Sequence, residues 1–512
     1  MLNDYMRKIL TARVYDLAVQ TPLDPMPRLS ERIGHRVSLK REDLQAVFSF
    51  KLRGAYNKMT HLSKDGLSRG VICASAGNHA QGVALAARHL HTRATIVMPT
   101  TTPAIKIQAV ERLGGHAIVH GDSFDEAYAH ARHLEQTSGL TFIHPFDDPE
   151  VIAGQGTVGL EMLRQHSEPI GAIFVQIGGG GLAAGVAAGI KFLRPDIKVI
   201  GVEPVDAASM KAAIAAGHPV PLDQVGLFAD GVAVRQVGQV TFGLCQALLD
   251  EIITVDGDEI CAAVKDIFDD TRAIAEPAGA VGLAGLKSYA ARHPGITGAL
   301  LAINSGANLN FDRLRHISER AEIGEKREAL FAVTIPEKPG SYRRFMETLG
   351  KRSITEFNYR YSGTDTARIF VGIELRGGDE EKHQIARHLG ELGYGVTDMS
   401  ENEMAKGHVR YMVGGRFDGL SDELIFRFEF PERPGALLKF LNDMPQGWNI
   451  SLFHYRNHGA DHGRVLAGIQ IPREQRADFQ TFLDRLHYDY WDETQNPAYR
   501  LFLAGKPDVG RV

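Results

Sequence analysis

Short apolar runs alternate with alanine-rich stretches of helical length over residues 35–310. The apolar runs of strand length are 71–74, 94–98, 117–119, 172–177, 199–202 and 299–303. Two of the stretches between them, 79–91 and about 103–113, have the composition of helices. Strands that alternate with helices form a mostly parallel sheet with helices on both faces. Because the span is long for one sheet, we predict an α/β region of two lobes with a cleft between them.

The pattern changes near residue 311, where a charged, helix-prone segment (311–329) connects to an internal repeat. Each copy begins with a strand that ends in Pro-Glu-(Lys/Arg)-Pro-Gly and then enters a helix. The matched blocks are 330–341 with 425–436, and 354–360 with 450–456. Two matched blocks in the same order predict a duplicated β-α-β module, and therefore a tandem of small α+β units.

Composition narrows the class of protein. The 512 residues, of which 44% are hydrophobic and 23% charged, predict a globular protein of about three domains. Lys and Arg number 57 against 62 Asp and Glu, so the net charge of −5 gives no reason to expect nucleic acid or a membrane as a partner. The three cysteines, Cys73, Cys245 and Cys261, are far apart in sequence, which argues against a disulfide framework and a thiolate metal site.

Two segments bear on whether the protein is secreted or membrane-bound. The first ten residues contain no apolar signal core, so we expect a cytoplasmic protein. Residues 171–190 are nearly uncharged and about long enough to span a bilayer. Four consecutive glycines interrupt this stretch, however, and predict a strand, a loop and a helix instead.

The glycine run Gly178–Gly181 predicts a phosphate site. Backbone N–H groups of such a loop can converge on one anion at the positive end of a helix. The run does not identify the phosphate by itself. Gly178-x-Gly180-x-x-Ala183 also satisfies the loose dinucleotide fingerprint, and Glu203 ends the next strand where a ribose-binding acid would be. A nicotinamide-dependent oxidoreductase therefore stays open at this point.

Three other segments carry polar groups at loops or helix starts. The segment Ser75–His79 offers side chains and unpaired N–H groups that suit a carboxylate, although an N-cap with a turn explains it equally well. Lys51 stands between Phe50 and Leu52, and a lysine in an apolar cleft has a lowered pKa and can form a Schiff base. A third loop, 304–308, supplies a serine. An amine, a phosphate cradle, a carboxylate site and a hydroxyl are what pyridoxal phosphate and an amino acid require.

Together, these motifs resemble a known family. Ser49-Phe-Lys-Leu-Arg-Gly-Ala55, Ser75-Ala-Gly-Asn-His79, the tetraglycine loop and Ser305-Gly-Ala-Asn308 occur in the order found in fold-type II pyridoxal-phosphate enzymes, and more narrowly in the serine/threonine dehydratases. With two ACT-like regulatory modules at the C-terminus, the whole chain is similar to the biosynthetic threonine deaminases (threonine ammonia-lyases). The resemblance implies an α/β catalytic domain of two lobes, like the β subunit of tryptophan synthase, with mostly parallel sheets, over 1–320. Two α+β modules would follow at 328–400 and 422–495.

The resemblance also assigns roles to residues. Lys51 would be the Schiff-base lysine and would remove the Cα proton, Phe50 would flank the cofactor ring, Asn78 would bind its 3′-oxygen, and Ser305 would meet the pyridine nitrogen. The phosphate would be held by Gly178, Gly179, Gly180, Gly181 and Leu182. The substrate carboxylate would be held by Ser75, Ala76, Gly77, Asn78 and His79. Because a neutral serine makes the pyridine a weaker electron sink, the pairing favours elimination over racemisation.

The implied reaction is the deamination of L-threonine to 2-oxobutanoate and ammonia. L-serine would be an alternative substrate. The reaction would be the committed step of isoleucine biosynthesis, inhibited by isoleucine and relieved by valine, in a homotetramer. The loops after Pro339-Gly340 and Pro434-Gly435, together with the second repeat blocks, are candidate effector contacts.

Four alternatives remain: a serine dehydratase, a serine racemase, a catalytically silent amino-acid sensor and the nicotinamide-dependent oxidoreductase, which leaves the loops of Lys51 and Asn78 without a role. Racemases of this fold carry serine at the position of Ala76, and the intact lysine argues against the sensor. Those racemases also bind a divalent metal, but Ser209 stands where their aspartate would, so we expect no metal despite Glu203.

Overall fold

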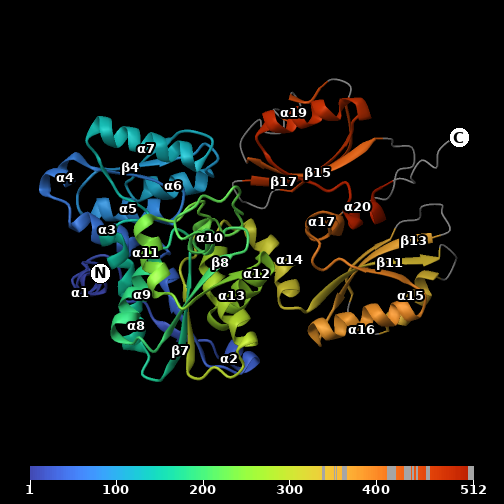
Figure 1. Ribbon diagram of the computed structural model, residues 1–512, viewed down its shortest axis with the longest axis horizontal. Coiled ribbons are helices and arrows are strands. Elements are labelled where there is room, and N and C mark those ends of the chain that lie inside the picture. Colours follow the sequence, from blue (N-terminus) through green and yellow to red (C-terminus); the bar gives the residue numbers. More distant parts are fainter. Residues whose placement is uncertain are drawn as a thin grey trace. The chain divides into compact units, whose positions relative to one another are not determined.

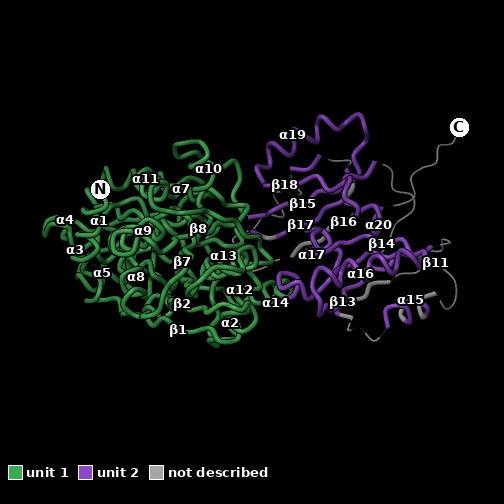
Figure 2. Tube along the Cα trace, turned by 60° about the horizontal axis from the view of Figure 1, so that its bottom comes forward, with its two compact units in different colours: residues 1–321 green, residues 322–512 purple. Residues whose placement is uncertain are grey.

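The computed structural model is shown in Figure 1. It describes residues 1–336, 341–350, 352, 354–359, 366–411, 422–431, 440, 443–445, 448–456 and 462–504. Contacts between Cα atoms divide the chain into two compact units, Met1–Ala321 and Glu322–Val512, which Figure 2 colours separately. Each unit has hydrophobic cores of its own.

Unit 1 contains two sheets. The larger has the strand order β1-β2-β10-β7-β8-β9, and all neighbours are parallel except β1 and β2. Its strands are β1 (Leu23–Pro25), β2 (Val37–Arg41), β7 (Ile170–Gln176), β8 (Lys198–Pro204), β9 (Glu251–Val255) and β10 (Ala299–Asn304). The smaller sheet is parallel throughout, in the order β5-β4-β3-β6. Its strands are β3 (Val71–Ala74), β4 (Ala94–Met98), β5 (His116–Val119) and β6 (Thr141–Phe142). The predicted two-lobed α/β fold with mostly parallel sheets is confirmed.

Helices cover both faces of each sheet. They are α1 (Leu2–Leu10), α2 (Pro27–Ile33), η1 (Glu42–Leu44), α3 (Lys51–Thr60), α4 (Lys64–Arg69), α5 (Asn78–His89), α6 (Ala104–Arg112), α7 (Phe124–Ser138), α8 (Pro149–Gln165), α9 (Gly181–Leu193), α10 (Ser209–Ala216), η2 (Asp230–Val232), α11 (Gln239–Leu248), α12 (Gly257–Thr271), α13 (Pro277–Arg292) and α14 (Arg313–Gly324). On β7, Ile173 and Val175 face the core formed with α1, α8, α9 and α11, whereas Ala172 and Phe174 face α12 and α13. Apolar residues are therefore needed at positions 172–175 of this strand, because successive side chains point to opposite, covered faces.

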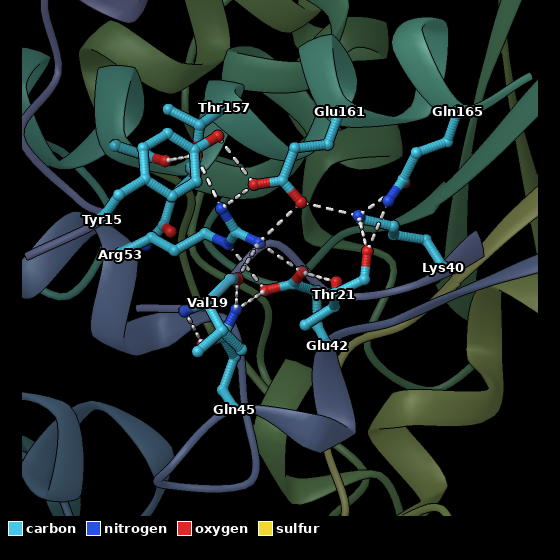
Figure 3. Close-up of polar contacts among 12 residues, drawn as sticks. Tyr15, Val19, Thr21, Lys40, Glu42, Gln45, Arg53, Thr157, Glu161 and Gln165 are labelled. Carbon is cyan, nitrogen blue, oxygen red and sulfur yellow. Dashed lines mark hydrogen bonds and ion pairs between the residues drawn. The ribbon is translucent and has the colours of Figure 1, made fainter. Parts of the chain in front are cut away.

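A buried ion network ties the helix that begins at Lys51 to its neighbours (Figure 3). Arg53 of α3 donates to Glu42 at 2.7 Å and to Glu161 of α8 at 2.5 Å. Lys40 of β2 donates to Glu161 at 2.6 Å, and all four side chains are fully buried. Two cations face two anions, so the charges of the network balance. The network joins α3 to α8 and to the larger sheet.

Unit 2 contains two antiparallel four-stranded sheets of the same topology. Their orders are β12-β13-β11-β14 and β16-β17-β15-β18. The strands of the first are β11 (Glu328–Pro336), β12 (Ile354–Tyr359), β13 (Thr366–Glu374) and β14 (Gly395–Asp398), and those of the second are β15 (Glu423–Pro431), β16 (Asn449–Arg456), β17 (His462–Gln470) and β18 (Asp489–Asp492). The helices and turns are α15 (Ser341–Leu349), α16 (Gly378–Glu391), α17 (Glu403–Gly407), η3 (Val409–Tyr411), η4 (Arg473–Gln475), α19 (Arg476–Leu486) and α20 (Pro497–Phe502). The repeat predicted from the sequence thus corresponds to two α+β modules.

The two modules share one core. In the first module, α15 and α16 cover one face of the sheet, and the other face contributes Leu330 and Phe370 to a cluster with Ile425 and Leu466 of the second. Residues after β18 complete this cluster, and the ring of Phe370 lies 5.7 Å from that of Phe502. Two faces that would be exposed in isolated modules are thereby buried. The candidate effector loops at 339–340 and 434–435 lie outside the described residues.

The described chain also bears on the membrane and disulfide predictions. No helix within the described ranges is long and apolar enough to cross a membrane. All three cysteines are free thiols buried in the core.

Candidate active site

Lys51 is the first residue of α3 and its side chain is half-buried. Its Nζ donates to the carbonyl oxygen of Pro145 at 2.9 Å and lies 5.4 Å from the ring centroid of Phe50. Burial lowers the pKa of Lys51 to about 8, although the carboxylate of Glu276 opposes this shift. A sizeable fraction of the amine is therefore neutral near physiological pH, and only the neutral amine can attack a carbonyl group.

The loop before Lys51 pairs with the loop that contains Ser305. Ser49 forms an antiparallel bridge with Gly306, and the backbone N–H of Phe50 donates to the carbonyl oxygen of Ser305 at 3.2 Å. Ser305 follows β10 and is 3% exposed, with its Oγ 3.5 Å from the carbonyl oxygen of Ala278. The structure therefore brings together two segments that stand at opposite ends of the catalytic sequence.

The segment 75–79 connects β3 to α5. Ser75 Oγ accepts a hydrogen bond from the N–H of Gly77 at 3.2 Å, and a Cβ atom built on Gly77 would meet no atom within 4 Å. Open space therefore adjoins the start of α5, where the first N–H groups have no acceptor within the helix. His79 is turned away into the core, because its Nε2 contacts the carbonyl oxygen of Ile143 at 2.9 Å. Burial, followed by the charge of Lys51, lowers the pKa of His79 to about 3, so this ring is neutral.

The tetraglycine loop connects β7 to α9. Gly180 caps the helix with a φ of 93°, in the left-handed region that favours glycine. A Cβ atom on Gly179 would overlap the ring of Phe146, so only glycine fits at this position. Thr241 fixes the loop by donating from its hydroxyl to the carbonyl oxygen of Gly179 at 2.7 Å. The loop and the first turn of α9, which includes Leu182, present backbone N–H groups at the positive end of a helix.

Asn78 and Glu276 form the part of the site that the sequence motifs do not explain. Asn78 Nδ2 donates to Glu276 Oε1 at 2.6 Å, and Asn78 Oδ1 accepts from Asn308 Nδ2 at 2.6 Å. Burial, together with the nearby charge of Asp230, raises the pKa of Glu276 to about 7. Sequence reasoning missed Glu276, and it also missed Phe146 and Thr241, because none belongs to a recognised motif.

Glu203 lies outside this arrangement. Its two carboxylate oxygens accept the N–H groups of Met210 at 2.7 Å and Lys211 at 2.9 Å, at the start of α10. Burial raises the pKa of Glu203 to about 7. Its carboxylate therefore caps the start of helix α10. In the described part of the chain, no group of three or more His, Cys, Asp or Glu side chains could hold a metal ion.

The residues present fit pyridoxal phosphate. The amine of Lys51 suits covalent attachment, the glycine loop at the start of α9 offers backbone N–H donors to a phosphate, and the amide of Asn78 can donate to a ring oxygen. The neutral hydroxyl of Ser305 is the group available to a pyridine nitrogen. These four functions come from loops of both sheets of unit 1.

Comparisons with known proteins identify the family. A family model described as pyridoxal-phosphate dependent enzyme matches residues 14–306, and a model of the C-terminal regulatory domain of threonine dehydratase matches 319–409 and 415–503. The biosynthetic L-threonine dehydratase IlvA of Burkholderia multivorans is 56% identical, over 98% of this chain and 99% of that protein. The corresponding protein of Escherichia coli is also 56% identical, over 98% and 97% of the two chains.

Solved structures agree with this assignment. The processed form of threonine deaminase isoform 2 from Solanum lycopersicum has a TM-score of 0.61 and 52% identity, and the match covers 62% of this chain and 93% of that one. Maize serine racemase has a TM-score of 0.57 and 33% identity, with coverage of 61% and 95%. The racemase shares the fold, whereas the relatives that match the whole chain are threonine dehydratases. The chain belongs to the pyridoxal-phosphate dependent enzymes and, within them, to the biosynthetic threonine dehydratase family.

Proposed function

We propose that this chain deaminates L-threonine by elimination of water, which yields 2-oxobutanoate and ammonia. The observation that carries the proposal is the half-buried amine of Lys51 in a threonine dehydratase sequence: its pKa is lowered to about 8, and it donates to Pro145, whose neighbour Phe146 packs against Gly179 and Gly181 of the glycine loop. Pyridoxal phosphate, when bound, supplies an electrophilic carbonyl for the amine and an electron sink for the substrate. The nicotinamide alternative has no support in this family.

The residues divide the work among themselves. Lys51 binds the cofactor and then takes the Cα proton of the substrate, because a partly neutral amine is a competent base. Phe50 would flank the ring, Asn78 would donate to its 3′-oxygen, and Ser305 would meet its nitrogen. The phosphate would be held by Gly178, Gly179, Gly180, Gly181 and Leu182. The substrate carboxylate would be held at the start of α5 by Ser75, Ala76, Gly77, Asn78 and His79, the last through its backbone N–H, because its ring is turned into the core.

Ala76 bears on the alternative reactions. A racemase needs a second acid or base on the face opposite the lysine, and the methyl group of Ala76 cannot transfer a proton. Elimination is therefore favoured over racemisation at this site. L-serine carries the same leaving group as L-threonine, so it is the second substrate to test.

Purified protein tests the proposal directly. We expect the yellow absorbance of a lysine-bound cofactor, and borohydride reduction followed by peptide mapping places the label on Lys51. Lys51→Ala should lose the label and 2-oxobutanoate formation. The control is Lys58→Ala, which lies on the same helix as Lys51 and removes only an ion pair with Asp148, and it should retain both. Colourless protein, or a label on another residue, contradicts the assignment.

We further propose that the two C-terminal modules carry control by isoleucine, with valine opposing it, in a homotetramer. The proposed domains are 1–320, 328–400 and 422–495, and the sheets of unit 2 span 328–398 and 423–492. Because the modules share a core, an effector bound to one can act on the other, provided that it binds two states differently. The three free, buried thiols support a reducing compartment such as the cytoplasm.

Removing residues 322–512 tests the regulatory role. We expect a protein that keeps the borohydride label on Lys51 and loses inhibition by isoleucine. Full inhibition of the shortened protein contradicts the proposal. Sedimentation of the full chain with and without isoleucine measures its oligomeric state.

A further inference from the structure

The carboxyl group of Glu276 borders the site without a role in the reaction described above. Glu276 is 4% exposed, and its Oε1 accepts the hydrogen bond from Asn78 at 2.6 Å. Gly306 leaves room for this carboxyl group, because a Cβ atom there would lie 2.6 Å from Oε1. Burying an ionisable group costs free energy unless its partners compensate. The partners of Glu276 therefore indicate what it does.

The neighbours of Asn78 define which way its amide points. Asn308 Nδ2 donates to the carbonyl oxygen of Val47 at 2.8 Å, and a carbonyl oxygen can only accept, so the nitrogen of Asn308 is identified. The same nitrogen donates to Asn78 Oδ1 at 2.6 Å. Asn78 consequently turns its own nitrogen toward Glu276. One N–H of Asn78 is used by Glu276, and the second is left for another acceptor.

Charged groups from three elements act on Glu276. Asp230 of η2 pairs with Lys106 of α6 at 2.8 Å and with Arg313 of α14 at 3.2 Å. Burial and Asp230 raise the pKa of Glu276, while the bond from Asn78 and the two cations oppose the rise. The Glu276 carboxylate in turn raises the pKa of Lys51 against the effect of burial. The charge of Glu276 is therefore felt at the lysine that binds the cofactor.

We propose that Glu276 is a positioning residue, which holds the amide of Asn78 so that its second N–H donates to the ring oxygen of bound pyridoxal phosphate. This inference rests on the proposed function, which assigns that oxygen to Asn78. The chain Val47, Asn308, Asn78, Glu276 anchors the amide at both ends. The carboxylate also favours the protonated state of the Lys51 nitrogen, because opposite charges attract across a site of low dielectric constant.

Two variants separate the hydrogen bond from the charge. Glu276→Gln keeps an oxygen that accepts from Asn78 but removes the charge, whereas Glu276→Ala removes both. We expect Glu276→Gln to keep the cofactor Kd and the absorbance maximum of the wild type, and to lower the midpoint of the pH titration of the bound cofactor. Glu276→Ala should raise the Kd by up to about tenfold, since a hydrogen bond between neutral groups, which Glu276→Gln still provides, contributes about 0.5–1.5 kcal/mol, and should shift the absorbance maximum. Asn308→Ala should resemble Glu276→Ala in both readouts.

The control is Asp266→Asn, a buried carboxylate of the same unit that pairs with Arg32 and Lys287. It should leave the absorbance maximum and the titration midpoint unchanged, which separates a positioning role from general loss of stability. Wild-type values of Kd, absorbance maximum and midpoint in both Glu276→Ala and Asn308→Ala would overturn the inference.

Cofactor-free protein distinguishes this inference from the proposed function. The rate at which an amine reagent modifies Lys51 should rise with pH around a midpoint near 8, and the midpoint should fall in Glu276→Gln. Wild-type protein that binds no pyridoxal phosphate contradicts the proposed function. An unchanged midpoint in Glu276→Gln contradicts the electrostatic part of the inference, whether or not the cofactor binds.

Discussion

Replacing Arg53 by methionine tests whether the buried ion network stabilises the catalytic unit. Arg53 is fully buried and donates to the carboxylates of Glu42 and Glu161, to the carbonyl oxygen of Val19 and to the hydroxyl of Thr157. Methionine fills much of the same volume without a charge. The variant therefore leaves two buried carboxylates with Lys40 as the remaining cation among the four side chains.

The size of the effect follows from the geometry. Removing one partner of a buried ion pair costs about 3–5 kcal/mol, because the other charge stays buried and unpaired. Unit 1 extends from Met1 to Ala321, and an unfolding entropy of about 2.1 cal/mol/K per residue gives roughly 0.7 kcal/mol/K for the unit. The melting temperature should therefore fall by about 4–7 °C.

The loss of stability in Arg53→Met should depend on pH. Burial raises the pKa of Glu42, but the charge and hydrogen bonds of Arg53, with smaller contributions from Thr21 and Lys40, together outweigh it and hold the pKa below its ordinary value. Without Arg53, burial dominates and the pKa of Glu42 rises above its unfolded value. The ionised carboxylate then destabilises the variant as pH increases above that unfolded value. Arg53→Met should consequently lose more stability, relative to the wild type, at pH 8 than at pH 5.

Scanning calorimetry at equal scan rates measures both effects. The matched control is Arg36→Met, which removes an exposed ion pair whose side chains are 71% and 49% accessible. Exposed pairs contribute about 0–1 kcal/mol, so this control should melt within about 2 °C of the wild type. The reasoning is refuted if Arg53→Met melts like Arg36→Met, or if its deficit is the same at both pH values.

Two further predictions concern the cofactor. Gly180→Ala should weaken pyridoxal-phosphate binding at least tenfold, because alanine at a φ of 93° is strained by about 1–2 kcal/mol and its methyl group would crowd Met210 and Thr241. Gly217→Ala, with a φ of 77° and no atom within 4 Å, is the control for strain alone. Equal Kd values for the two variants contradict the prediction. The rate of cofactor attachment to cofactor-free protein, followed by absorbance, should rise with pH and level off above about 8, since the neutral form of Lys51 reacts; a rate that is flat between pH 6 and 9 contradicts the lowered pKa.

The hydrophobic pattern predicted the strands that are buried on both faces. The predicted runs 71–74 and 94–98 coincide with β3 and β4, because every side chain of a covered parallel strand is apolar or small. β2 was not predicted, because two of its five residues are charged. It ends in Lys40 and Arg41, which read as solvent-exposed charges but are buried against Glu161 and Asp43. The pair of Lys40 with Glu161 joins segments distant in sequence, so it leaves no local signal.

The repeat in the C-terminal region was predictable because it required only a comparison of the chain with itself. The strands at 330 and 425 appear as β11 and β15, each at the same place in its sheet. The fourth strand of each module, β14 and β18, was not predicted, because its sequence differs between the copies. The shared core of the modules was not predicted either, because apolar residues on both faces of β11 read as an ordinary buried strand.

The candidate site shows where the sequence rule for α/β proteins ends. Ligands of such proteins bind beyond the carboxyl ends of parallel strands, and three of the predicted loops follow β3, β7 and β10. Glu276 escapes this rule, because it stands between two helices, immediately before Pro277 of α13. In a sequence, an acidic residue before a helix that begins with proline reads as an N-cap. In the structure, the Glu276 side chain makes no hydrogen bond to its own helix and accepts one from Asn78 instead. An N-cap carboxylate that does not cap its helix therefore indicates a role elsewhere in the protein.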